Sequence, residues 1–218
     1  MTQSKEDYLK IIYEAELKNV EVNNKYIMKE LGVSAASVSE MLKKLEKDGF
    51  VEYVPYRNIV ITEQGRLKAI ALVRKHRLWE VFLLRHLGFS WSEVHDEAER
   101  LEHVTSETML ERMDAFLSYP EICPHGGKIP RENDYTPEIR TIPLSNCQEG
   151  QVCKIMRVPE DKNILEYLSQ IGLGIGEVFQ IKEIGQFEGM FVLKNELKEV
   201  SISYKVACEL FVSVECTI

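Results

Sequence analysis

Apolar residues recur every three or four positions through the first half of the chain, which predicts a series of amphipathic helices. The first three are expected over residues 5–17, 25–31 and 35–47. Gly32 and Ser34 separate the second helix from the third, and these residue types end and begin helices, respectively. Two short helices joined by a tight, glycine-containing turn predict a helix-turn-helix.

After Asp48-Gly49 the helical pattern gives way to an alternation of the kind found in strands. Residues 50–62 therefore predict two strands around a turn at residues 55–58, with Arg57 at the tip. A helix-turn-helix followed by a hairpin with a basic tip predicts a winged helix that binds DNA. A winged helix that binds another protein is the alternative.

The expected third helix begins with small and hydroxyl side chains, which let a helix N-terminus enter the major groove and meet phosphates. Lysines follow on its exposed side and suit phosphate contact. The candidate DNA-contacting residues come from both helices and the hairpin tip: Asn24, Lys25, Ser34, Ala36, Ser37, Glu40, Lys44 and Arg57.

Three further helices are expected over residues 65–87, 92–104 and 105–117, followed by an irregular, proline-rich stretch. Their apolar faces are broader than one small domain needs, which predicts dimerisation through them. A dimer would present two recognition helices to two DNA half-sites.

Potential metal ligands stand at positions i, i+4, i+7 and i+8 of the expected helix 92–104: His95, Glu99, Glu102 and His103. This spacing places them on one helical face, and imidazoles with carboxylates are ligands for divalent metals. His76 and Glu80 repeat the i, i+4 spacing in the preceding helix. Two such helices favour a metal site over an ordinary solvated face. Cys123 and His125, in a proline- and glycine-rich loop, offer half of another site, or belong to an ordinary loop.

Short strands and turns replace the helical pattern from about Cys147 onward. Strands are expected over residues 150–157, 178–184, 190–193, 200–203 and 210–214, with one helix over 162–171. This order predicts a small barrel similar to an SH3 fold. The glycine-rich stretch 172–176 leads into a strand, so it is not a dinucleotide-binding loop.

The net charge of −8 is unevenly distributed. Residues 1–68 hold 11 basic and 11 acidic residues, leaving 16 of the 27 basic and 24 of the 35 acidic residues to the rest. A local basic face for DNA is therefore compatible with the overall acidity. The absence of a long apolar run or an apolar leader predicts a cytoplasmic protein. The five cysteines, without a CxxC pair, are expected to be thiols.

Several of these segments resemble the diphtheria-toxin repressor and manganese transport regulator family of metal-dependent repressors. They are K-E-D-Y-L-K at 5–10, V-S-A-A-S-V-S-E-M at 33–41, R-K-H-R-L-W-E-V-F-L at 74–83 and C-P-H-G-G at 123–127. The last motif resembles the three-domain, manganese-responsive branch of the streptococcal and enterococcal type. The expected fold is mainly α with a small β part. It has a winged helix-turn-helix domain (1–72), a helical dimerisation and metal-binding domain with linker (73–140) and an SH3-like, FeoA-type domain (141–218).

The resemblance implies two metal sites. The regulatory site would use Asp7, Glu99, Glu102 and His103, with His76 close by. The second would use Glu80, Cys123, His125 and Glu160. Relatives carry Asp at the last position, so the adjacent Asp161 is the alternative fourth ligand. His95 belongs to an ancillary site in iron-responsive relatives.

The resemblance also implies a function. Iron sensors of the family carry Met and Cys where this chain has Asp7 and Glu99, and carboxylates favour Mn(II) over later metals. We expect a Mn(II)-activated, homodimeric repressor of metal-uptake genes that binds palindromic operators, as one dimer or two, and is not an enzyme. Zn(II) or Cd(II) would substitute in vitro. Without metal, repulsion between the carboxylates should loosen the regulatory site. The alternatives are an Fe(II)-responsive member of the family, a Mn-dependent hydrolase, a metal buffer and a redox sensor using Cys123.

Overall fold

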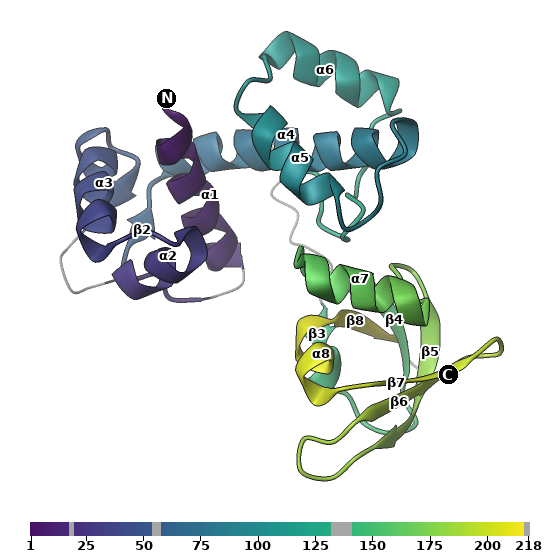
Figure 1. Cartoon of the computed structure of the whole chain (residues 1–218). Coiled ribbons are helices and arrows are strands. Elements are labelled where there is room, and N and C mark those ends of the chain that lie inside the picture. Colours follow the sequence, from purple (N-terminus) through teal and green to yellow (C-terminus); the bar gives the residue numbers. More distant parts are fainter. Residues whose placement is uncertain (18–19, 54–57, 132–140, 216–218) are drawn as a thin grey trace. The chain divides into compact units, whose positions relative to one another are not determined.

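The computed structural model describes residues 1–17, 20–53, 58–131 and 141–215 (Figure 1). Contacts divide the chain into two compact units. The first comprises Met1–His76 with Glu99–Leu110, and the second comprises Arg77–Ala98 with Glu111–Ile218.

The first unit contains the predicted winged helix. Its helices are α1 (Gln3–Leu17), α2 (Asn24–Leu31) and α3 (Ala35–Lys47), and its antiparallel strands are β1 (Val51–Glu52) and β2 (Val60–Ile61). The predicted caps are confirmed: Gly32 ends α2 with φ of 65°, and the Ser34 hydroxyl accepts a hydrogen bond from the Ser37 N–H. Asn23 caps the start of α2, where its side chain accepts a hydrogen bond from the Tyr26 N–H.

The core of the first unit lies among these helices and the hairpin. Its fully buried side chains include Leu9, Ile12, Ile27, Leu42 and Leu45. On α1, Leu9 is buried and Ile11 is only partly so. Lys10 is also buried, which its charge does not suggest.

The helices of the middle of the chain are α4 (Glu63–His86), α5 (Val94–Glu102) and α6 (Glu107–Phe116). Helix α5 is shorter than the predicted 92–104, so His103 lies in the turn that follows it. None of the helices in the described ranges is long and apolar enough to cross a membrane.

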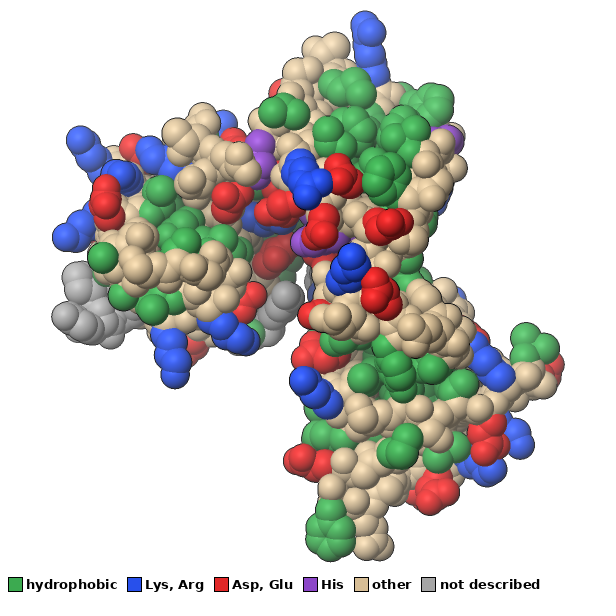
Figure 2. All heavy atoms as spheres, viewed as in Figure 1, with side chains coloured by type: hydrophobic (Ala, Val, Ile, Leu, Met, Phe, Trp, Pro, Cys, Tyr) green, Lys and Arg blue, Asp and Glu red, His purple; other side chains and the backbone are tan. Residues whose placement is uncertain are grey.

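Hydrophobic side chains gather over α6 on the face drawn in Figure 2. Phe116, at the end of α6, is 61 % exposed and packs against the rings of Phe82 and His86 from α4. A gathered apolar patch of this kind, unlike a single exposed residue, is the kind of surface that a partner covers.

The C-terminal part of the second unit is a six-stranded antiparallel sheet in the order β3-β8-β4-β5-β6-β7. The strands are β3 (Ile142–Pro143), β4 (Val152–Arg157), β5 (Val178–Ile184), β6 (Phe191–Lys194), β7 (Glu199–Ile202) and β8 (Phe211–Glu215). Helix α7 (Lys162–Ile171) follows β4, while the short α8 (Tyr204–Glu209) and η1 (Leu144–Asn146) were not predicted. A winged helix, a helical middle and a small C-terminal sheet domain confirm the predicted fold class.

The C-P-H-G-G loop packs directly against strand β4. The His125 carbonyl accepts a hydrogen bond of 3.0 Å from the Val158 N–H. Gly126 has φ of 88°, and a Cβ built there would lie 2.0 Å from the Met156 carbonyl oxygen. Only glycine permits this approach, which carries the loop to the segment that leads to α7.

Candidate metal centres

The structure brings together the residues expected to form the regulatory site. We define the first cluster as Asp7, Glu99, Glu102 and His103, whose ligand atoms lie within 4.8 Å of one another. Asp7 comes from α1, the two glutamates from α5 and His103 from the turn after α5. The predicted convergence of α1 and α5 is therefore present.

His103 has a fixed orientation in the first cluster. Its Nδ1 lies 2.6 Å from Glu6 Oε2, so this nitrogen donates to the carboxylate and leaves the lone pair on Nε2. Nε2 faces Asp7 Oδ1 at 3.0 Å and Glu102 Oε1 at 3.6 Å. In many metal sites the ligating histidine likewise donates its other ring N–H to a carboxylate.

Two atoms of the first cluster are buried without a hydrogen bond. Among the described residues, Asp7 Oδ1 and His103 Nε2 both have this property although they face each other. Burial raises the pKa of Asp7. A carboxylate oxygen and an imidazole lone pair both accept, so a cation between them would satisfy both. The residues present therefore fit a divalent metal.

Lys10 enters the same cluster and was missed at the sequence level. Its ammonium donates to Glu99 Oε2 at 2.7 Å and to Glu102 Oε2 at 2.9 Å. It also lies 3.1 Å from Nδ1 of His76, which contacts Glu102 Oε2 at 2.5 Å. Burial alone would lower the pKa of Lys10, but Glu102 and Glu99 outweigh it and raise the pKa.

This arrangement corrects one expectation. We expected unopposed repulsion among Asp7, Glu99 and Glu102 without metal, and instead Lys10 supplies a counter-charge to both glutamates. Lys10 stands three residues after Asp7, so both lie on one face of α1, and this spacing could have identified it. Glu6, the immediate neighbour of Asp7, could have been identified by its position beside that ligand. The predicted proximity of His76 to this cluster is present through its contact with Glu102.

The structure also brings together the residues expected for the second site. We define the second cluster as Glu80, Cys123, His125 and Glu160, whose ligand atoms lie within 4.8 Å of one another. Asp161 is not among them, because its Oδ1 caps α7 by accepting from the Ile164 N–H at 3.0 Å. Of the two candidates for the fourth position, Glu160 is the one that lies with the other three residues.

His125 is oriented in the second cluster by the main chain. Its Nε2 lies 3.1 Å from the carbonyl oxygen of Trp91, so Nδ1 is left to face Glu80 Oε1 at 2.9 Å. The Trp91 ring stacks on the imidazole, and its indole N–H donates to the Pro124 carbonyl. These contacts hold the C-P-H-G-G loop in place beside the fully buried Glu80.

Protons would compete with a metal for the ligand atoms of the second cluster. Burial alone would lower the pKa of His125, but the hydrogen bond with Glu80 outweighs it and raises the pKa. Burial and the charge of Glu80 raise the pKa of the Cys123 thiol well above its usual value. A metal bound here would have to displace these protons.

His95 lies with residues of the second cluster. Its Nδ1 is 3.2 Å from Glu160 Oε2 and 3.9 Å from Glu80 Oε1. Burial alone would lower its pKa, but the neighbouring carboxylates of Glu160 and Glu80 outweigh burial and raise the pKa to about 10. His95 thus borders the second cluster rather than the first, although its sequence spacing groups it with Glu99 and Glu102.

The candidate DNA-contacting residues lie mainly on the surface of the winged helix. The exposed ones are Lys25, Ser34, Ala36, Ser37, Glu40 and Lys44. Asn24 is partly buried and donates to the Ser39 hydroxyl at 3.1 Å, and Glu40 and Lys44 form an ion pair of 2.7 Å. Arg57 lies outside the described residues.

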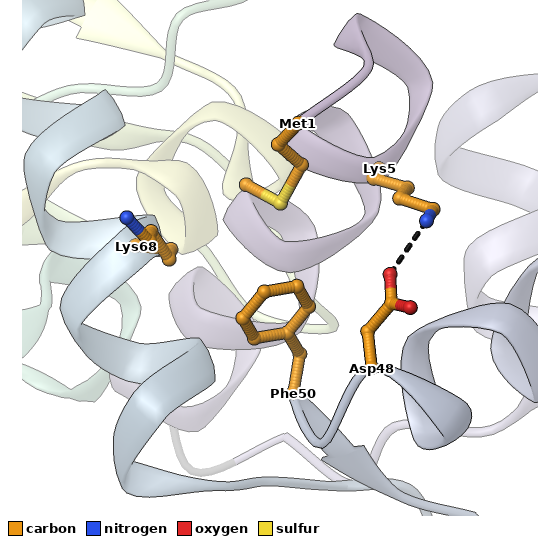
Figure 3. A pocket seen from close by; sticks show the side chains of 5 residues that line it. All are labelled: Met1, Lys5, Asp48, Phe50 and Lys68. Atoms are coloured by element: carbon orange, nitrogen blue, oxygen red, sulfur yellow. Dashed lines mark hydrogen bonds and ion pairs between the residues drawn. The ribbon is translucent and has the colours of Figure 1, made fainter.

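A separate cavity of about 410 Å³ in the first unit is lined by Met1, Lys5, Asp48, Phe50 and Lys68 (Figure 3). Its only carboxylate, Asp48, already pairs with Lys5 at 2.5 Å. This lining lacks the convergent ligands of the two clusters.

Models of three protein families match successive parts of the chain. They are described as iron dependent repressor, N-terminal DNA binding domain (residues 1–59), iron dependent repressor, metal binding and dimerisation domain (62–131), and FeoA domain (142–214).

Individual proteins agree with this match. The diphtheria toxin repressor of Corynebacterium efficiens is 34 % identical over 199 residues, which cover 85 % of this chain and 86 % of that protein. The iron-dependent repressor IdeR of Mycobacterium tuberculosis is 38 % identical over 130 residues, or 60 % of this chain, and the match spans 56 % of that protein. The structure of the manganese regulator SloR is 38 % identical and covers 99 % of this chain and 100 % of that chain, with a TM-score of 0.81.

Proposed function

The chain belongs to the iron-dependent repressor family of metal-dependent, DNA-binding transcriptional regulators, and we propose that it is a Mn(II)-activated repressor of metal-uptake genes. It would bind palindromic operator DNA as a homodimer, with one or two dimers on each operator, in the cytoplasm. It would have no catalytic activity of its own.

The observation that carries this proposal is the composition of the first cluster. Three carboxylates and one imidazole, with no sulfur, converge on a point where Asp7 Oδ1 and His103 Nε2 lack hydrogen bonds. Hard oxygen ligands suit Mn(II). SloR is described as a manganese regulator, which agrees with this choice. Zn(II) and Cd(II) would bind in vitro, because later metals bind nitrogen and oxygen ligands more tightly.

Fe(II) is the second candidate, because the chain is similar to the diphtheria toxin repressor and to the iron-dependent repressor IdeR. The second cluster, which includes the Cys123 thiol, is the more suitable for a later metal.

The proposed mechanism starts from the elements that the first cluster joins. Asp7 stands on α1 of the winged helix, Glu99 and Glu102 stand on the last turn of α5, and His103 follows in the next turn. A divalent metal would supply the positive charge that lets Asp7 and His103 remain in contact. Asp7 and Glu102 then hold α1 against the end of α5, and Glu6 keeps His103 turned toward them. Fixing the winged helices at one spacing favours two major-groove contacts one helical turn apart.

The second cluster would have a supporting role. Glu80 is on α4, Cys123 and His125 are in the C-P-H-G-G loop, and Glu160 precedes α7. Linking these segments would fasten the C-terminal domain to the helical domain. We propose three functional domains for this arrangement: 1–72 for DNA, 73–140 for dimerisation and metal, and 141–218 for support.

DNA binding by the chelator-treated full chain tests the proposal. Fluorescence anisotropy would be measured at fixed salt on a palindromic site selected from random duplexes, with no metal, Mn(II), Fe(II) or Zn(II). We expect specific binding only with metal and its loss in an Asp7→Asn variant. Equal binding without metal would refute the switch. Metal binding without any specific DNA binding would favour a metal buffer, and phosphatase or peptidase activity with Mn(II) would favour a hydrolase.

A further inference from the structure

We propose that Lys10 sets the metal threshold of the first cluster, as a built-in cation that weakens the binding of the divalent metal. This inference rests on the proposed function, because it concerns the affinity of the same cluster. It adds a residue that is not among the expected ligands and assigns it an electrostatic role toward them.

The contacts of Lys10 are those of a cation inside a ligand set. Its side chain is 7 % exposed, and its ammonium lies 2.7 Å from Glu99 Oε2. Both oxygens of Glu102 are also in reach, at 2.9 Å and 3.1 Å, and His76 Nδ1 is at 3.1 Å. An ammonium has three N–H donors, and the three carboxylate oxygens of Glu99 and Glu102 are enough to use all of them.

Glu102 is shared between Lys10 and the open side of the cluster. Its Oε1 lies 3.1 Å from the Lys10 ammonium and 3.6 Å from His103 Nε2. The glutamate side chain is fully buried, so solvent screens these charges poorly. The ammonium partly neutralises the negative charge of Glu102. Glu102 therefore attracts a metal beside His103 and Asp7 less strongly.

The charges of the cluster point to the same role. Asp7, Glu99 and Glu102 carry three negative charges, and the ammonium of Lys10 offsets one of them before any metal binds. A site without Lys10 would attract the metal more strongly. At the effective dielectric constant of protein sites, removing a unit charge a few ångströms from a divalent ion should tighten binding at least about tenfold.

Lys10 would therefore keep the metal affinity of the first cluster low enough for the cluster to respond to changes in cellular metal concentration. A cluster that was too strong would stay occupied at every cellular metal concentration and could not switch. The ammonium also stabilises the glutamates when no metal is bound, which keeps the cluster assembled.

The test compares Mn(II) binding to the wild-type chain and to Lys10→Gln. Equilibrium dialysis would give the Kd and the number of ions bound, and the component absent from Asp7→Asn would be assigned to the first cluster. We expect Lys10→Gln to lower the Kd of that component at least about tenfold. Its metal-free form should melt at a lower temperature, and Mn(II) should raise its melting temperature more than in the wild type.

Two matched variants isolate the charge. Lys5→Gln removes the same charge one turn earlier on α1, where Lys5 pairs with Asp48, and should leave the Kd unchanged. Lys10→Arg keeps the charge and should stay close to the wild type.

An unchanged or higher Kd in Lys10→Gln would overturn the proposal. So would a Lys10→Gln chain that stays unfolded in saturating Mn(II), because the metal should replace the lost positive charge. If the wild type and Asp7→Asn bind Mn(II) identically, the first cluster is not a metal site, and the proposed function fails instead.

Discussion

The contact between Glu6 and His103 gives the most specific prediction of the structure. Glu6 Oε2 lies 2.6 Å from His103 Nδ1 on the side away from the other ligands. Glu6→Gln keeps an acceptor for this hydrogen bond but removes the charge that makes the imidazole a stronger ligand. We expect weaker Mn(II) binding at the first cluster and no change at the second.

The size of the effect follows from the burial of Glu6. Removing a residue that orients a metal-bound imidazole usually costs 10- to 100-fold in affinity. The Glu6 side chain is 22 % exposed, so solvent replaces part of its effect and the loss should be about tenfold. A tenfold loss corresponds to about 1.4 kcal/mol.

The assay is a Mn(II) titration of the chelator-treated chain, followed by DNA binding at the same salt concentration. Glu16→Gln is the matched control, because Glu16 is also on α1 but pairs with Arg66. It should bind Mn(II) like the wild type. The same Kd in Glu6→Gln and Glu16→Gln would show that Glu6 does not orient a metal ligand.

Three other predictions concern the second unit. Gly126→Ala would place a Cβ 2.0 Å from the Met156 carbonyl, so it should lower the melting temperature and the Mn(II) bound at the second cluster, whereas Gly174→Ala meets open space and should not. The raised pKa values of the thiol and imidazole of the second cluster mean that these ligands keep their protons up to higher pH. Metal affinity there should therefore fall as pH falls, and binding should release protons, which calorimetry in buffers of different ionisation enthalpy would detect. Phe116→Asp should raise the dissociation constant of the dimer at least about tenfold, as measured by sedimentation. A Phe187→Asp control, on the turn between β5 and β6, should leave this constant unchanged.

Much of the fold was predictable because helix periodicity and caps are local. Gly32 and Ser34 fixed the boundary between α2 and α3, and α7 and β5 have the predicted bounds. The short α8 and β3 were not predicted, because a helix of six residues and a strand of two residues carry too little periodicity.

The spacing of Glu99, Glu102 and His103 predicted part of the first cluster, whereas Asp7 and Glu160 came only from the family resemblance. Spacing alone grouped His95 with Glu99 and Glu102, whereas the structure puts His95 beside Glu160. Lys10 was missed because a lysine on α1 is ordinarily solvated, and its burial depends on Glu102 from a distant segment. Tertiary contacts of this kind leave no local pattern in the sequence.

The most direct test of the central claim is the affinity of the first cluster for Mn(II), measured with and without the selected operator duplex. Binding sites that are coupled must influence each other by the same factor. If the metal joins α1 to α5 and so fixes the winged helices, the duplex should lower the Kd of Mn(II) by the factor by which Mn(II) strengthens DNA binding. An identical Kd with and without the duplex would contradict the account.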